Sequence, residues 1–252
     1  MRQPFYNVYA YCRWADDLAD LSPAPSVATE LLLDWRGQLD DCFAGQATHP
    51  IFIALRDTVQ RFSLTKAPFD DLLDAFLQDQ IKLRYQSFDE LLDYCRRSAN
   101  PVGRIVLRLA DSDTDRDNLR FSDSICTGLQ LANHWQDVAR DFQVGRVYLP
   151  LEDAQRFGVD LERIDQTQQR EVFCKLIHFE CGRAEAFLRR GLPLADRVPS
   201  WLATDLRLMV YGGLAVLEAI AKVDGDVLKM RPRVSRLRQI RLMIAAALAR
   251  LD

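Results

Sequence analysis

The residues best suited to chemistry form two oxygen-rich clusters, each at helical spacing. In the first cluster Tyr9, Arg13, Asp16 and Asp20 are three or four residues apart, so on a helix they share one face. Asp16 and Asp20 would then lie about 6 Å apart along the helix axis. Like charges at this spacing repel, and oxygen ligands so arranged suit Mg²⁺. A solvated acidic face is the simpler alternative for this cluster alone.

The second cluster consists of Gln130, Asn133, Asp137 and Asp141, again three or four residues apart. Apolar neighbours such as Trp135 fall on other faces of the expected helix and can pack. If the two polar faces oppose one another, they form a carboxylate-lined cleft for several Mg²⁺ ions around a diphosphate. Mg²⁺ needs only one or two protein carboxylates, because water and phosphate oxygens complete its shell. Both clusters together favour a metal site over two unrelated acidic faces.

Other kinds of catalytic site lack their residues. No glutamate has a histidine three residues later, as a di-iron bundle requires. The three histidines, His49, His134 and His178, are too dispersed for a zinc site, and we expect His134 to pack in the core. The sequence has no G-x-G-x-x-G fingerprint, which argues against a dinucleotide site and weakly against an NADPH-dependent reduction.

Composition and charge narrow the class of protein. The 252 residues are 48% hydrophobic, and 33 Lys+Arg against 36 Asp+Glu give a net charge of −3. This balance argues against nucleic-acid binding. Six scattered cysteines without a C-x-x-C pair are typical of reduced thiols in a cytoplasmic protein. Neither a signal peptide nor a membrane span is expected. One basic cluster stands out: Lys229, Arg231, Arg233, Arg236, Arg238 and Arg241.

Apolar residues recur at helical spacing along most of the chain, and alternation typical of strands is nearly absent. Turn-forming segments separate about eight expected helices, and no compositional break marks a domain boundary. Ser87 and Glu90 predict a capping box. Pro101, inside an apolar pattern over residues 88–109, predicts a helix kink. The sequence therefore predicts a single all-α domain over residues 1–252.

Several motifs, in order along nearly the whole chain, resemble the squalene/phytoene synthase family. Besides the two clusters they include Asp79 within residues 76–85, the segment YCRRSANPVG at 94–103 and the segment GRVYLP at 145–150. The segments SANPVG and NHWQDV look most like the bacterial hopanoid-pathway branch. Phytoene and dehydrosqualene synthases usually show an Ala-Gly pair that is missing here. The resemblance implies an isoprenoid-synthase-type helical bundle around a central cavity. Because few residues precede Asp16, the usual N-terminal helix is expected to be lacking.

The resemblance also implies roles for individual residues. The implied ligands of about three Mg²⁺ ions are Asp16, Asp20, Asn133, Asp137 and Asp141, with Asp17 beside them. The residues implied to contact the diphosphate are Arg13, Arg146 and Tyr148. Those implied to line the prenyl cavity are Tyr9, Tyr94, Gln130 and Tyr211. Arg140 lies off the metal-binding face and is expected to pair with an acidic neighbour.

The activity implied by the resemblance is conversion of presqualene diphosphate to hydroxysqualene, in a Mg²⁺-dependent ionisation. Farnesyl diphosphate is the alternative substrate, and a phytoene-type reaction is a further alternative. Head-to-tail elongation or terpene cyclisation is disfavoured by the GRVYLP segment and by the Asn-x-x-x-Asp-x-x-x-Asp form of the second cluster. A catalytically inactive assembly partner is the non-enzyme alternative. An apolar substrate and the basic cluster are compatible with transient contact to the inner face of a membrane.

Overall fold

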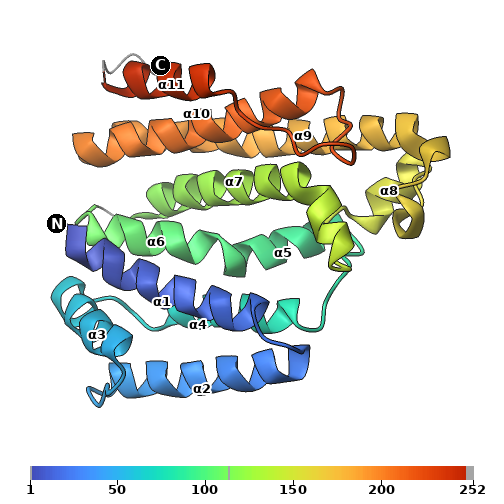
Figure 1. The fold of residues 1–252 in the computed structure, drawn as a ribbon. Helices are drawn as coiled ribbons and strands as arrows, with labels where there is room; N and C mark the ends of the chain where they lie inside the picture. Colours follow the sequence, from blue (N-terminus) through green and yellow to red (C-terminus); the bar gives the residue numbers. More distant parts are fainter. Residues whose placement is uncertain (1, 113, 248–252) are drawn as a thin grey trace. The chain divides into compact units, whose positions relative to one another are not determined.

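Every regular element that the computed structural model describes, over residues 2–112 and 114–247, is helical (Figure 1). The expectation of an all-α fold is therefore confirmed. The described residues form eleven α-helices rather than about eight. Three short 3₁₀ turns, Leu161–Arg163, Thr167–Gln169 and Leu192–Asp196, flank α9 on either side.

The chain contacts divide into two compact units. Unit 1 comprises Met1–Lys82 and Arg97–Thr114, and unit 2 comprises Leu83–Arg96 and Asp115–Asp252. The helices of unit 1 are α1 (Arg2–Asp20), α2 (Pro25–Phe43), α3 (Pro50–Phe62), α4 (Ala67–Asp79) and α6 (Asn100–Leu109). Unit 2 contains most of α5 (Phe88–Ser98), together with α7 (Arg116–Gln143), α8 (Leu151–Phe157), α9 (Arg170–Gly191), α10 (Ser200–Lys222) and α11 (Arg236–Ala247).

An aromatic core fixes α1 within unit 1. The buried face of α1 includes Val8, Tyr11, Ala15 and Ala19, which recur every three or four residues. The ring of Tyr11 packs against three aromatic rings, those of Trp35, Phe52 and Phe69. Its hydroxyl donates a hydrogen bond of 3.1 Å to the backbone carbonyl of Phe69. The helix is therefore held in one rotation, with its polar face turned away from this core.

The helix expected to kink at Pro101 is interrupted instead. α5 ends at Ser98, α6 begins at Asn100, and Ala99 between them has φ −123° and ψ −48°. Proline lacks the backbone N–H and its ring clashes with the carbonyl four residues earlier, so the two helices separate at this point. The interruption accounts for one of the additional helices. At the start of α5 the N–H of Glu90 donates to Ser87 Oγ over 3.2 Å, as the capping box predicts.

Glycines allow α7 and α9 to approach closely in unit 2. A Cβ at Gly191 would lie 2.3 Å from Ile125 Cγ1 and 2.8 Å from the carbonyl oxygen of Phe121. A Cβ at Gly128 would lie 2.9 Å from the backbone nitrogen of Leu188. Because backbone atoms stand at both places, neither position has room for a larger residue. These contacts hold α7, the helix that carries the second oxygen-rich cluster.

A buried group of charges joins α5, α8 and α9. Arg183 Nη1 lies 2.5 Å from Asp153 Oδ2 and 3.2 Å from Glu180 Oε1. The guanidinium also lies over the rings of Phe88 and Phe179, at 4.1 and 4.4 Å from their centroids. Burial raises the pKa of Glu180 to about 8, although the nearby Arg183 acts in the opposite direction. The protonated form of Glu180 is therefore favoured in the folded chain at neutral pH.

We expect Glu180→Gln to remove part of the pH dependence of stability. Because the folded chain binds this proton more tightly than the unfolded chain, the contribution of Glu180 to stability is largest at low pH. It is lost as the pH rises from the ordinary glutamate value, about 4.3, through the folded value of about 8. Denaturant titrations at pH 5 and pH 8.5 should show that the variant gains stability relative to the native chain only at the higher pH. An equal difference at both pH values would contradict the raised pKa.

Candidate active site

The first half of the predicted site lies on α1, on the face opposite its buried residues. Arg13 bridges two carboxylates there, with Nη1 at 2.9 Å from Asp16 Oδ2 and Nη2 at 2.5 Å from Asp17 Oδ1. The chain itself therefore places one positive charge beside Asp16. Asp20 is exposed in the last turn of the helix, and 65% of Tyr9 is exposed.

The second half lies on α7, which continues without interruption for 28 residues. Gln130, Asn133, Asp137 and Asp141 therefore share one face of a single helix, as their spacing predicts. Their environments differ, since Asn133 is exposed, Gln130 and Asp141 are half-buried, and the Asp137 side chain is only 12% exposed. A carboxylate so little exposed needs a cation or several hydrogen bonds to remain charged.

Arg231 provides that cation to Asp137. The guanidinium contacts both carboxylate oxygens, Nε on Oδ1 and Nη2 at 3.0 Å from Oδ2. The Nη2 group also donates to Gln136 Oε1 at 3.0 Å, and Gln136 Nε2 donates to the Pro232 carbonyl at 2.7 Å. The hydrogen bond to Asp137 raises the pKa of Arg231, so the guanidinium stays charged. Arg140, expected to pair with an acid, lies more weakly against Asp137, with Nη1 at 3.9 Å from Oδ1.

The donor chemistry of these two faces fits Mg²⁺. The α1 face offers carboxylate oxygens, and the α7 face offers carboxylate and amide oxygens, which are the donors that Mg²⁺ prefers. No group of three or more His, Cys, Asp or Glu side chains gathers at ion-binding distance within the described part of the chain. A Mg²⁺ ion held here would therefore depend on water and phosphate oxygens for much of its shell.

Four stacked rings form a second feature of unit 2. His134 lies 3.8 Å from Tyr148 between ring centroids, nearly parallel to it, and Tyr85 stacks on the same tyrosine at 5.7 Å. The centroid of the Tyr94 ring lies 5.5 Å from that of Tyr85, 5.8 Å from that of Tyr148 and 6.1 Å from that of His134. Burial lowers the pKa of His134 to about 3, so the imidazole is neutral. The packing role expected for His134 is confirmed.

Backbone hydrogen bonds fix the loop that carries Arg146 and Tyr148. The Val147 N–H donates to the Leu83 carbonyl at 3.0 Å, and the Leu151 N–H donates to the Tyr85 carbonyl at 2.9 Å. Gly145 has φ +80°, a conformation that favours glycine and allows the chain to turn directly after α7. The loop therefore places Tyr148 against Tyr85 and Tyr94. Arg146, two residues before Tyr148 in the same loop, is half-buried.

Tyr211, predicted to line the prenyl cavity, belongs to a different packing group. It lies on α10 and packs against a small cluster formed by Ala215, Leu242 and Ala246. Within unit 2 the structure therefore brings together Tyr94 and Tyr148 but places Tyr211 at the contact between α10 and α11.

Three residues of the site escaped the sequence analysis: Tyr85, Gln136 and Arg231. Tyr85 ends the recognised stretch of residues 76–85, and Gln136 lies inside the segment NHWQDV, so membership of a motif was an available signal for both. Arg231 was visible only as one member of the basic cluster.

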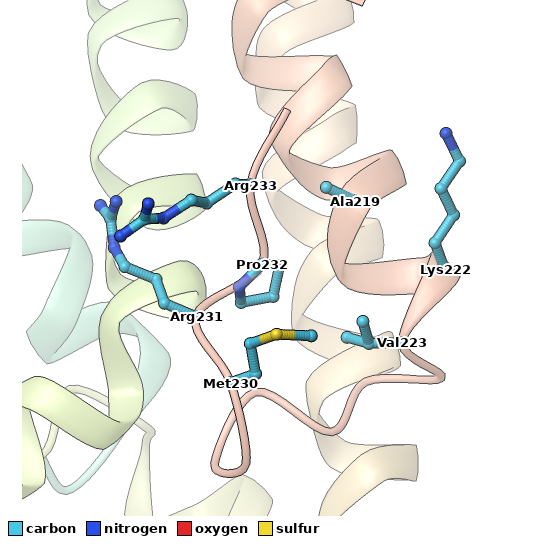
Figure 2. Close-up of a pocket in the computed structure, with 7 residues that line it drawn as sticks. All are labelled: Ala219, Lys222, Val223, Met230, Arg231, Pro232 and Arg233. Atoms are coloured by element: carbon cyan, nitrogen blue, oxygen red, sulfur yellow. The ribbon is translucent and has the colours of Figure 1, made fainter. Parts of the chain in front are cut away.

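A hollow of about 440 Å³ lies beside Arg231, between the end of α10 and the segment that leads to α11 (Figure 2). Its lining residues are Ala219, Lys222, Val223, Met230, Arg231, Pro232 and Arg233. Figure 2 shows the side chains of Arg231 and Arg233 extending away from Met230 and Val223. The hollow is consequently apolar on the side of Met230, and the guanidinium of Arg231 is directed to α7.

The arrangement of helices is that of isoprenoid-synthase-type proteins, as comparison with solved structures shows. The chain is similar to the squalene synthase HpnC from Alicyclobacillus acidocaldarius, with a TM-score of 0.83 and 40% identity over 88% of this chain and 83% of that one. It is also similar to a dehydrosqualene synthase solved with a ligand, with a TM-score of 0.83 and 25% identity over 98% and 86% of the two chains.

Sequence comparison gives the family. The profile of the squalene/phytoene synthases matches residues 1–238, and the chain belongs to this family. Relatives include phytoene synthase from Arthrospira platensis, 33% identical over 92% of this chain and 79% of the relative. The 15-cis-phytoene synthase from Synechocystis is 32% identical over 86% of this chain and 69% of the relative. The family consists of prenyltransferase-type enzymes that bind prenyl diphosphates.

Proposed function

We propose that the protein is a Mg²⁺-dependent squalene-type synthase that converts presqualene diphosphate to hydroxysqualene. The observation that carries the proposal is the oxygen-rich face of α7, where Asn133, Asp137 and Asp141 share one side of a single uninterrupted helix. The similarity to the HpnC squalene synthase, at 40% identity, supports a squalene-type product. The segments SANPVG and NHWQDV, which resemble the hopanoid branch, support the same choice.

The reaction exchanges diphosphate for water. The carbon–oxygen bond to the diphosphate breaks, the bonding electrons leave with the diphosphate, and the resulting carbocation takes up water and releases a proton. Mg²⁺, when bound by Asp16, Asp20, Asn133, Asp137 and Asp141, would neutralise charge on the leaving diphosphate. Arg13 and Arg146 are proposed to orient that diphosphate through charge-assisted hydrogen bonds.

The aromatic rings are proposed to protect the carbocation. The π-faces of Tyr94 and Tyr148 attract positive charge, and buried aromatic packing excludes water except where one molecule is admitted. Neutral His134 adds no positive charge that would repel the cation. Tyr9 and Gln130 are proposed to contact the prenyl chain, as the family resemblance implies.

A phytoene-type reaction is the second candidate, because the relatives from Arthrospira and Synechocystis are phytoene synthases. Condensation of two farnesyl diphosphate molecules to presqualene diphosphate is a third, and its continuation to squalene would require an added hydride donor such as NADPH. These candidates differ in substrate and in product, so a direct assay separates them.

The test is incubation of the purified chain with presqualene, farnesyl or geranylgeranyl diphosphate, each with Mg²⁺ and each with a chelator. We expect hydroxysqualene from presqualene diphosphate only with Mg²⁺, and the alcohol oxygen should come from isotopically labelled water. Phytoene from geranylgeranyl diphosphate would replace the proposal with the second candidate. No product from any substrate, in a chain with an intact helical spectrum, would favour the non-catalytic alternative.

A further inference from the structure

The last helix and the segment before it form an acid-free basic stretch. Residues 227–247 contain six lysines and arginines and no aspartate or glutamate. Two of these cations are paired, Arg231 with Asp137 and Arg238 with Glu218 at 3.1 Å. The other four have no ion-pair partner among the described residues: Lys229, Arg233, Arg236 and Arg241. Four unneutralised cations on one segment call for an anionic partner.

An exposed apolar stripe runs along the same helix. Leu242 and Ala246 are buried against Ala215 of α10, which fixes the inner face of α11. On the outer side, side chains that are 47 to 72% exposed form the stripe: Leu237, Ile240, Met243 and Ile244. By helical spacing, Arg241 borders this stripe on one side, and Arg236 lies in line with it at the N-terminal end of the helix. An apolar face flanked by arginines is the pattern of a helix that lies in a membrane interface.

The chemistry favours a lipid surface over another protein. The cores of protein interfaces are depleted of charged residues, whereas here Arg236 lies at the N-terminal end of the apolar stripe and Arg241 at its edge. Arginine side chains can extend from an apolar stripe to the phosphates of lipid headgroups. Among the described helices, none combines the length and apolar character needed to cross a bilayer, so the contact would be made along the surface.

We propose that α11, with residues 229–235 before it, docks in the plane of a bilayer that contains anionic phospholipids. The apolar stripe lies at the boundary of the acyl chains, and Arg236 and Arg241 of α11 face the headgroup phosphates. This inference is independent of the proposed reaction, because it uses neither the substrate nor the metal. It also places a membrane-facing segment next to Arg231, the residue that holds Asp137.

The test is co-sedimentation of the purified chain with vesicles of phosphatidylcholine, with or without phosphatidylglycerol. We expect binding to the anionic vesicles, weaker binding to the neutral ones, and a decrease as salt increases. Arg236→Gln and Arg241→Gln should each lower the partition coefficient about fivefold, the change that corresponds to about 1 kcal/mol per cation near the surface. The double variant Ile240→Ser/Ile244→Ser should lower the partition coefficient at high salt as well, because salt does not screen the burial of apolar side chains.

Matched controls separate this surface from nonspecific effects. Arg163→Gln removes an equally exposed cation elsewhere in unit 2, and Ile53→Ser changes an exposed apolar residue on α3, so neither should alter binding. Circular dichroism checks that each variant keeps its helices. Equal binding to both vesicles, or no effect of the α11 variants, would overturn the proposal. Isoleucine variants that dissociate an oligomer without changing vesicle binding would assign the stripe to a contact between copies and would also overturn it.

Discussion

Asp137→Asn is expected to lower turnover about a thousandfold or more while leaving the fold intact. The amide keeps the size of the side chain and a hydrogen-bond acceptor for Arg231, but it removes the negative charge that a metal ligand needs. A thousandfold loss corresponds to about 4 kcal/mol of transition-state stabilisation. The measurement is the rate of diphosphate release from the substrate identified by the product assay, at saturating Mg²⁺.

Asp117→Asn is the matched control for this variant. Asp117 lies in the first turn of the same helix, about 30 Å along the axis from Asp137, and pairs with Arg120 at 3.3 Å on the surface. An exposed pair of this kind contributes little to stability, so the control should retain full turnover. If Asp137→Asn also kept turnover within a few-fold of the native chain, the assignment of α7 as a metal-binding helix would be wrong.

Gly191→Ala is expected to lower the free energy of unfolding by about 3 kcal/mol. The backbone of Gly191 has φ −81° and ψ −17°, which alanine adopts readily, so the cost is steric rather than conformational. The added Cβ would overlap Ile125 and the backbone of Phe121 on α7, and overpacking of this kind forces helices apart. We expect the midpoint of thermal unfolding to fall by roughly 10 °C.

The control for Gly191→Ala is Gly182→Ala, on the same helix. Nothing lies within 4 Å of the position that a Cβ at Gly182 would occupy. Alanine has the higher helix propensity, so this variant should gain up to about 1 kcal/mol. Opposite signs for the two variants are the expected result. Two gains of similar size would show that α7 and α9 are not in the close contact described.

Local periodicity explains which parts of the fold were predictable. The shared face of Asn133, Asp137 and Asp141 follows from three- and four-residue spacing alone, and α7 has that face. The same argument predicted the polar face of α1, on which Arg13 bridges Asp16 and Asp17. At Pro101 the sequence correctly predicted an irregular helix. It predicted a kink where the structure has a complete interruption, because the two outcomes differ only in how the flanking residues pack.

Contacts between distant segments were not predictable in this way. Arg231 reaches Asp137 across 94 residues of sequence, and nothing in the basic cluster indicates which of its cations turns inward. The stack of Tyr85, Tyr94 and Tyr148 likewise depends on the path of three segments. The opposition of the two oxygen-rich faces, the magnesium ions and the single-domain organisation remain predictions from the sequence.

The division of the chain into two units affects which fragments can be produced separately. Leu83–Arg96 belongs to unit 2 although it lies between two segments of unit 1, so neither unit is encoded by one uninterrupted stretch. A fragment that started at Asp115 would lack Tyr85 and Tyr94, the partners of Tyr148. Such a fragment should expose that ring surface and aggregate, unless a peptide covering residues 83–96 is supplied in trans to restore it.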